Sequence, residues 1–322
     1  MDFKLNVDRD EIRILQLTDM QVIDSSQQRS PTRLCEAEYL KWLPETVEDN
    51  IYSHIRYLVE KTQPDLIIIT GDIIYGEFDD SGRVFDEFCD FMDSFGIPWA
   101  PVFGNHDNES MRGIDWQCER FASSKCSFFK RGSVFGNSNY SIGIYSNGKL
   151  IRNIFMTDSN GCGKLNIPSG FNGDQLDWIR SEAKELCGIP SFMCFHIPTQ
   201  DFNDAAIIAG YQEKEDARDS FFSYEIGKTV SAREGMGEFG KKTECLPPRN
   251  DRLLPFFKEC NIDGLFAGHF HRISTSIVNE GVRFTFGYKT GLYDYHDPEA
   301  MGGTLITLNG KDFDIQHIQY PL

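Results

Sequence analysis

Polar residues of the types that bind metal ions occur in five short motifs spread over most of the chain. The motifs are LTDMQ, ITGD, VFGNHD, CFHIP and LFAGHFH, and each begins in a run of apolar residues. Carboxylate, carboxamide and imidazole ligands suit a catalytic site for divalent or trivalent ions better than a cysteine-rich structural zinc site. The candidate ligands and reactive groups are Asp19, Gln21, Asp72, Asn105, His106, Asp107, His196, His269 and His271.

Hydrolysis of a phosphate ester is the reaction that such a set serves best. This reaction is among the slowest uncatalysed ones, so it needs a strong nucleophile and neutralisation of the phosphoryl charge. Two metal ions about 3.5 to 4 Å apart supply both. A carboxylate shared by the ions would hold them together, and Asp72, which follows the most hydrophobic apolar run, is the natural bridge.

Each of these residues also has an ordinary structural explanation when it is considered alone. A histidine in an apolar run, such as His196, is often a hydrogen-bonded core residue. An aspartate after a strand, such as Asp19 or Asp72, often caps a turn. However, all five motifs follow predicted strands, which is where open α/β sheets bind ligands. We therefore interpret the whole set as one site.

The hydrophobic pattern predicts an α/β fold. Apolar runs that contain β-branched residues indicate buried strands, and amphipathic stretches between them indicate helices. After His271 the pattern changes to short strands and turns. We expect a single domain over residues 1–322, with two packed sheets and helices outside them. The predicted strands are 12–17, 66–70, 99–103, 151–156, 192–195, 262–267, 273–278, 282–286, 303–308 and 314–319, and the predicted helices are 36–61, 84–95, 173–186 and 251–260.

Residues 199–250 interrupt this pattern. The stretch is polar, rich in Gly and Glu, and shows no sustained strand or helix repeat. Segments of this length without regular structure are usually functional lids or disordered loops. Because it lies between two of the metal-binding motifs, we predict a lid-like insertion.

Composition limits the partners. The formal net charge of -17 opposes binding to nucleic acid, which requires a face of Lys and Arg. A metal site can still attract a small phosphate ester, because bound cations are the strongest local charges. The sequence shows no secretory signal, no apolar run of about 18 residues and no CxxC pair among its nine cysteines. We therefore expect a cytoplasmic protein that does not span a membrane.

The motifs resemble the signature of the calcineurin-like metallophosphoesterases, which reads DxH, GDxx, GNHD or GNHE, a single His, and GHxH. The last four blocks are intact, and the resemblance runs from Asp19 to His271. The segments GDIIYG, IPWAPVFGNHDNES and FHIP are most similar to the branch allied to purple acid phosphatases. The resemblance implies a four-layer αββα sandwich, with two mixed β-sheets flanked by helices. It also implies a dinuclear metal centre whose bridging hydroxide attacks phosphorus.

The resemblance implies a role for each motif. It places Asp72 between two metal ions and makes His106 the group that assists the leaving group, with Asp107 orienting it. The implied ions are manganese, iron, zinc or magnesium, and the implied substrate is a small phosphate ester or a phosphoprotein. The other implied ligands are Asp19 and His271 for the first metal, and Asn105, His196 and His269 for the second.

The first motif departs from the signature, because Gln21 stands where DxH has its histidine. A carboxamide oxygen is a weaker, neutral ligand, which favours hard ions or incomplete occupancy at the first site. Purple acid phosphatases also lack this histidine and use a tyrosine of a GDxxY motif, so Tyr75 of GDIIY is a second candidate ligand. A tyrosine beyond a strand more often packs its ring.

Three functions remain open. The favoured one is a metal-dependent phosphomonoesterase, and a phosphodiesterase acting on a small or cyclic ester is the alternative within the same class. A non-catalytic phosphate-binding scaffold is the alternative of another class, with Gln21 as the mark of a degenerate first metal site.

Overall fold

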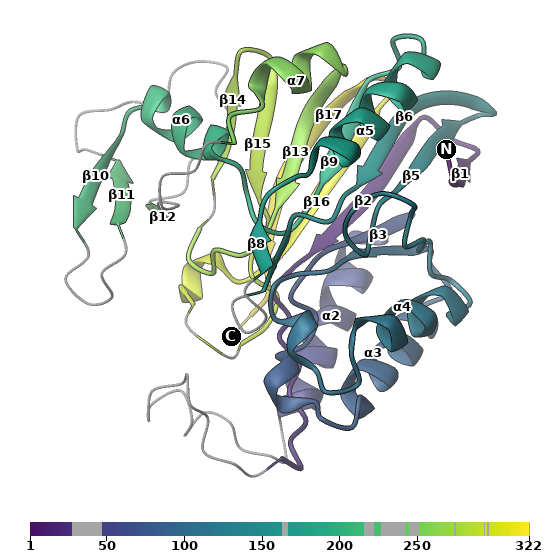
Figure 1. Cartoon of the computed structure of the whole chain (residues 1–322), viewed down its shortest axis with the longest axis vertical. Coiled ribbons are helices and arrows are strands. Elements are labelled where there is room, and N and C mark those ends of the chain that lie inside the picture. The colour runs from purple at the N-terminus through teal and green to yellow at the C-terminus, as the bar shows by residue number, and fades with distance from the viewer. Residues whose placement is uncertain are drawn as a thin grey trace.

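Two large mixed β-sheets lie face to face, and helices cover the outer side of each sheet (Figure 1). The computed structural model describes residues 1–27, 47–162, 167–215, 222–226, 242–244, 251–273, 275–292, 294 and 296–321. The arrangement confirms the predicted four-layer αββα sandwich. None of the helices within these ranges is long and apolar enough to cross a lipid bilayer.

The larger sheet has seven strands, and the strands in its middle are parallel. Its outer face is covered by α5 (Gly173–Glu185) and α7 (Leu254–Glu259). Ile179 of α5 belongs to the same buried cluster as Phe155 and Met193 of the sheet. The strand order is β1 (Phe3–Val7), β5 (Tyr140–Ser146), β6 (Lys149–Met156), β9 (Ser191–Cys194), β13 (Ile262–Ala267), β15 (Val282–Phe286) and β14 (Ser276–Asn279).

The smaller sheet has five strands and carries α2 (Val47–Thr62), α3 (Arg83–Asp93) and α4 (Ile114–Ser123) on its outer side (Figure 1). Its strand order is β17 (Asp312–Gln319), β16 (Gly302–Asn309), β2 (Glu11–Leu17), β3 (Leu66–Thr70) and β4 (Trp99–Val102). β2, β3 and β4 are parallel neighbours. All five residues of β3 are buried, as its uninterrupted apolar sequence predicts.

Every strand predicted from the sequence has a counterpart in the two sheets. The helix predicted over 36–61 is observed as α2, and its expected first part lies outside the described residues. The sequence did not reveal β1, β5 or α4, nor the short hairpin of β7 (Asn160–Cys162) and β8 (Ile167–Ser169). In β5, a glycine and polar residues interrupt the apolar pattern that marks a buried strand.

The prediction that residues 199–250 lack regular structure is wrong for the described part of this segment. It forms α6 (Gln200–Ala209), followed by a three-stranded antiparallel sheet of β10 (Tyr211–Glu215), β11 (Phe222–Ile226) and β12 (Lys242–Glu244). Helix α6 packs against β14, and the small sheet lies beyond it at the edge of the molecule (Figure 1). The helix was missed because Ile207 and Ile208, both exposed, extend its apolar residues beyond one face. The lid role stays a prediction, and residues 216–221, 227–241 and 245–250 lie outside the described part.

Candidate active site

The loops that follow five parallel strands carry all the predicted ligands. β2, β3 and β4 are neighbours in the smaller sheet, and β9 and β13 are neighbours in the larger one. The carboxyl ends of both groups of strands meet. At this place the Nδ1 of His196, which follows β9, donates a 2.8 Å hydrogen bond to the backbone oxygen of Thr70 at the end of β3. The fold thus brings five distant segments to one edge, where α/β proteins bind their ligands.

Asp72 lies at the centre of the site. Its Oδ2 is 3.3 Å from the Nε2 of His196, and the Oδ1 of Asn105 is 3.1 Å from the same nitrogen. Since the Nδ1 of His196 is engaged by Thr70, its Nε2 is the nitrogen left for a metal ion. The ring of His269 lies 5.2 Å from that of His196. These four side chains form the predicted set for the second metal.

Asp19 and His271 form the adjoining half of the site. The Nε2 of His271 is 3.2 Å from Asp19 Oδ1, and the backbone N–H of His269 donates to both oxygens of Asp19 at 3.2 and 3.0 Å. The Nδ1 of His271 is 3.4 Å from Asp294 Oδ2, which is how a second carboxylate orients a ligand imidazole. Asp19, Asp72 and His196 each offer one ligand atom, and the three atoms lie within 4.8 Å of one another.

The two buried carboxylates are held in their charged form. Burial opposes ionisation of Asp72, but the imidazoles of His196 and His106 hold its pKa well below its usual range. Burial opposes ionisation of Asp19 in the same way, but a hydrogen bond from His271 lowers its pKa to about 2. Two buried negative charges next to each other create a strong demand for a cation.

The imidazoles differ in their charge state. Burial and the neighbouring His196 lower the pKa of His269 to about 3, so His269 is neutral, as a metal ligand must be. Burial also disfavours the charged form of His196, but Asp72 raises its pKa to about 9. A metal ion at Asp72 would therefore displace a proton from His196.

Left-handed backbone conformations shape the ligand loops. Asp19 (φ 50°), Gln21 (φ 47°), Asp72 (φ 50°) and His269 (φ 77°) all have positive φ. Side chains other than glycine rarely adopt this conformation, which costs on the order of 1–3 kcal/mol each. Backbone hydrogen bonds help to stabilise these loop conformations. For example, the backbone N–H of Gln21 donates to the backbone oxygen of Asp72 at 2.9 Å.

Glycines allow the loops to approach one another. A Cβ at Gly104 would lie 2.2 Å from Asp72 Oδ1, and a Cβ at Gly268 would lie 2.0 Å from Thr18 Oγ1. Neither position leaves room for a side chain. The glycines of the GNHD and GHFH motifs are therefore part of the site's geometry.

Gly104→Ala is expected to weaken metal binding about tenfold or more, because the new methyl group would displace the Asp72 carboxylate. Metal content after dialysis and metal titration of the stripped protein would measure the effect. Gly173→Ala is the matched control, since its Cβ would meet nothing within 4 Å. Metal affinity equal to that of the wild type in Gly104→Ala would contradict the close-approach argument.

The carboxamide of Gln21 contacts a lysine that no motif in the sequence marks. Its Oε1 accepts a 2.6 Å hydrogen bond from the Nζ of Lys289. The same ammonium donates to the backbone oxygen of Asp19 at 3.0 Å. The role of Gln21 as a metal ligand stays a prediction, and in this structure its carboxamide oxygen already has a partner.

Tyr75 packs against the catalytic loop. Its buried ring stacks on the ring of His106 with centroids 4.5 Å apart and 28° between the planes. The centroid of the same ring lies 5.4 Å from that of the Phe78 ring. The ring-packing interpretation of Tyr75 is therefore observed, and its role as a metal ligand stays a prediction.

His106 is held from three sides. Its backbone N–H donates to Asp72 Oδ1 at 2.9 Å, its Nδ1 is 3.0 Å from Glu109 Oε2, and its ring lies on Tyr75. Burial lowers the pKa of His106, but Asp72 and Glu109 together raise it above its usual value. His106 is therefore fixed beside Asp72, and its role at the leaving group stays a prediction.

The family pattern implied that Asp107 orients His106, but the carboxylate that contacts the ring of His106 is that of Glu109. The carboxylate of Asp107 accepts hydrogen bonds from the backbone N–H groups of Ile73 and Ile74 through one oxygen and from Gly104 through the other. Asp107 therefore fixes the loops that carry the ligands, while Glu109 orients the ring of His106.

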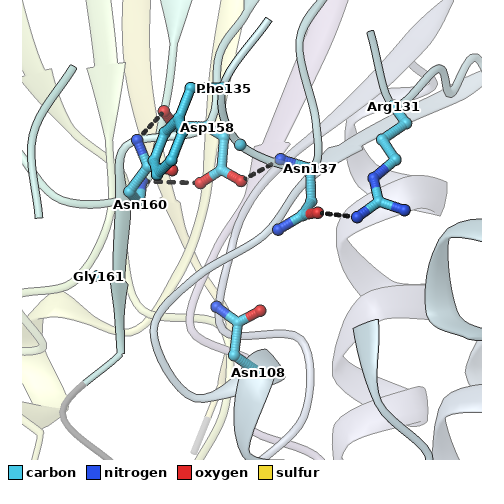
Figure 2. Close-up of a pocket in the computed structure, with 8 residues that line it drawn as sticks. Asn108, Arg131, Phe135, Asn137, Asp158, Asn160 and Gly161 are labelled. Atoms are coloured by element: carbon cyan, nitrogen blue, oxygen red, sulfur yellow. Dashed lines mark hydrogen bonds between the residues drawn. The ribbon is translucent and has the colours of Figure 1, made fainter. Parts of the chain in front are cut away.

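A pocket of about 240 Å³ lies beside the loop that carries Asn105. Figure 2 shows Asn108 of this loop facing Asn137 across the pocket, with Arg131 on one side and Phe135 on the other. The Nη2 of Arg131 donates to Asn137 Oδ1 at 2.7 Å. The wall at Gly161 reaches the loop that carries His196, because a Cβ there would lie 2.8 Å from Ile197 Cδ1. The pocket therefore adjoins two of the ligand loops.

The sequence offered unequal signals for the residues that it did not reveal. Glu109 stands three residues after His106 in HDNE, a spacing that lets side chains meet on a helical turn, and η2 (Asp107–Glu109) is such a turn. Lys289 and Asp294 follow β15 and reach the site only through the tertiary fold. No local pattern marks them.

Comparisons with known proteins point to the same class of protein. Probable inactive purple acid phosphatase 28 of Arabidopsis thaliana is 24% identical over 281 residues, which cover 77% of this chain and 64% of that protein. Phosphatase DCR2 of Saccharomyces cerevisiae is 29% identical over 150 residues, which cover 44% of this chain and 25% of that protein. The chain thus spans less than two thirds of the length of these relatives.

A solved structure described as a dimetal phosphatase from Danio rerio has a similar fold. Its TM-score is 0.55 at 11% sequence identity, and the similarity covers 95% of each chain. The profile of the calcineurin-like phosphoesterase family matches residues 12–272, which include every motif from Asp19 to His271. This match covers most of the chain and the relatives resemble purple acid phosphatases, so the chain belongs to the calcineurin-like phosphoesterase family.

Proposed function

We propose that this protein is a metal-dependent phosphomonoesterase that hydrolyses its substrate at the site around Asp72. The observation that carries the proposal is the meeting of two ionised, buried carboxylates with three imidazoles and an amide, all delivered by separate strand ends. A structural site would be expected to use a closed set of cysteine or histidine ligands. This set is mixed and lies beside the fixed ring of His106, which is typical of a catalytic centre.

The donor groups fit metal ions at two positions that share Asp72. Asn105, His196 and His269 would complete one position, and the remaining two ligands, Asp19 and His271, lie at the other. Metal ions held there would neutralise the phosphoryl oxygens and activate a water molecule for attack on phosphorus.

His106 is the group that we assign to the leaving alcohol. Glu109 engages its Nδ1 at 3.0 Å, so Nε2 is the nitrogen that remains to donate a hydrogen bond or a proton to the departing oxygen. Tyr75 and the backbone contact to Asp72 fix the ring, which keeps it in one orientation. Preorganisation of this kind favours the transition state over the bound substrate.

We place the alcohol part of the ester in the pocket beside Asn108. Its volume of about 240 Å³ suits a small molecule, and its polar walls at Asn137 and Asp158 suit a hydroxylated one. Phe135 is 51% exposed and offers an aromatic surface at the same place. A small polar alcohol that carries a flat ring would fit this combination.

Phe135→Ala is expected to raise KM for p-nitrophenyl phosphate about two- to tenfold and to leave kcat nearly unchanged, because an aromatic contact to the alcohol is lost. Steady-state kinetics would measure both constants. The inhibition constant of inorganic phosphate is the internal control, since phosphate alone would not reach the pocket. An unchanged KM would remove the pocket from the substrate site.

The proposed function is tested by turnover of paired substrates after reconstitution with manganese, iron, zinc or magnesium. Faster hydrolysis of p-nitrophenyl phosphate than of bis(p-nitrophenyl) phosphate supports the monoesterase, and the reverse order supports the phosphodiesterase. Metal-loaded protein without turnover of any ester supports the non-catalytic scaffold. That last alternative is favoured by one observation, the contact of Gln21 with Lys289 in place of a ligand imidazole.

A further inference from the structure

A buried lysine lies on the Asp19 side of the site. Lys289 is 1% exposed, and its Nζ donates to Gln21 Oε1 at 2.6 Å and to the backbone oxygen of Asp19 at 3.0 Å. Both acceptors are uncharged oxygens, so these bonds do not neutralise the ammonium. Burial lowers the pKa of Lys289, and the neighbouring carboxylates of Asp19, Asp294 and Asp72 oppose this shift and favour the ammonium.

The backbone fixes this lysine in place. The backbone N–H of Thr290 donates to the backbone oxygen of Thr18 at 2.9 Å, and that of Gly291 donates to the backbone oxygen of Asp19 at 3.2 Å. A Cβ at Gly291 would lie 2.0 Å from the backbone oxygen of Met20, so the two chain segments are in close contact. The backbone that carries Lys289 is therefore held against the first ligand loop, within reach of Gln21 and Asp19.

The ammonium also determines how Gln21 faces the site. Only the carboxamide oxygen can accept from Lys289, so this contact fixes which end of the amide points to the lysine. The Nε2 of Gln21 has no hydrogen-bond partner among the described residues. Its oxygen is thus engaged and its nitrogen is a donor, so neither end of the side chain is suited to a metal ion.

The geometry points to Lys289 as a fixed positive charge that takes over part of the role of the first metal ion. The protein then binds one ion tightly, at Asp72, Asn105, His196 and His269, and binds a second ion at Asp19 and His271 much more weakly. This inference rests on the metal-dependent function proposed above and concerns the number of ions that the site holds.

Calorimetric titration of the metal-stripped protein with Mn²⁺ or Zn²⁺ tests the inference. In the wild type we expect one tight equivalent and a second that is at least about tenfold weaker. In Lys289→Met, which keeps an unbranched side chain without its charge, the second equivalent should bind about tenfold more tightly or better. In Lys289→Met/Gln21→His both equivalents should bind with similar affinity, because an imidazole then completes the first set.

Lys258→Met is the matched control, because Lys258 is an exposed lysine that pairs with Glu280 on the surface. It should leave both equivalents unchanged. Two equally tight equivalents in the wild type would overturn the inference without any variant, even if Lys289→Met did not fold. An unchanged second equivalent in folded Lys289→Met would overturn it as well. Metal-loaded forms that hydrolyse no ester would count against the phosphoesterase function, while the number of bound ions would still decide the role of Lys289.

Discussion

Asp72→Asn is expected to lower kcat/KM about 10³-fold or more and to strip the protein of tightly bound metal. Both proposed metal positions share this carboxylate, and its Oδ2 is 3.3 Å from the Nε2 of His196. The asparagine keeps the shape of the side chain and removes its charge. Metal content of the purified variant and turnover under saturating metal would separate loss of binding from loss of chemistry.

Asp177→Asn is the control for this variant, because Asp177 is an exposed carboxylate on α5 that pairs with Arg180. It should retain metal and turnover. Wild-type metal content together with wild-type turnover in Asp72→Asn would remove Asp72 from the centre of the site.

His106→Ala is expected to lower kcat about 10²- to 10⁴-fold for esters of poor leaving groups while retaining metal. The ring is held beside the ligands by Glu109 and Tyr75, and His106 is not itself one of the predicted ligands. Because p-nitrophenolate departs without much assistance, its phosphate ester should be affected less than an alkyl phosphate. The dependence of kcat on the leaving-group pKa, measured in both proteins, would show this difference.

A purely structural role of His106 would give another result. In that case the loss of kcat would be the same for good and poor leaving groups, and metal content would fall with it. The leaving-group series therefore tests the chemical role of the histidine, which the overall activity alone does not.

The fold was readable because its central strands are mainly apolar. All of β3 is buried, as is β13 except at the partly buried Asp263, and a strand buried on both faces is recognisable without its neighbours. β1 was not identified, because its five residues show the alternation of a half-buried strand at a sheet edge and lack the continuous apolar run of the central strands.

The place of the proposed ligands in the fold was readable for a related reason. Each ligand stands directly after a strand, so its place at the sheet edge follows from the strand itself. The contact between Gln21 and Lys289 joins residues 268 positions apart and depends on how β15 and the following segment meet the first loop. Such a contact is a property of the tertiary fold, and no spacing in the sequence encodes it.

The left-handed conformations of Asp19, Gln21, Asp72 and His269 have a consequence for the choice of ion. Loops whose backbone is fixed before a metal ion binds cannot rearrange to provide a larger coordination sphere. Calcium takes about six to eight oxygen ligands in flexible loops, whereas the smaller transition-metal ions accept nitrogen donors at short distances. The rigid backbone should therefore select ions by their radius, and calcium should be a poor competitor even when it is abundant.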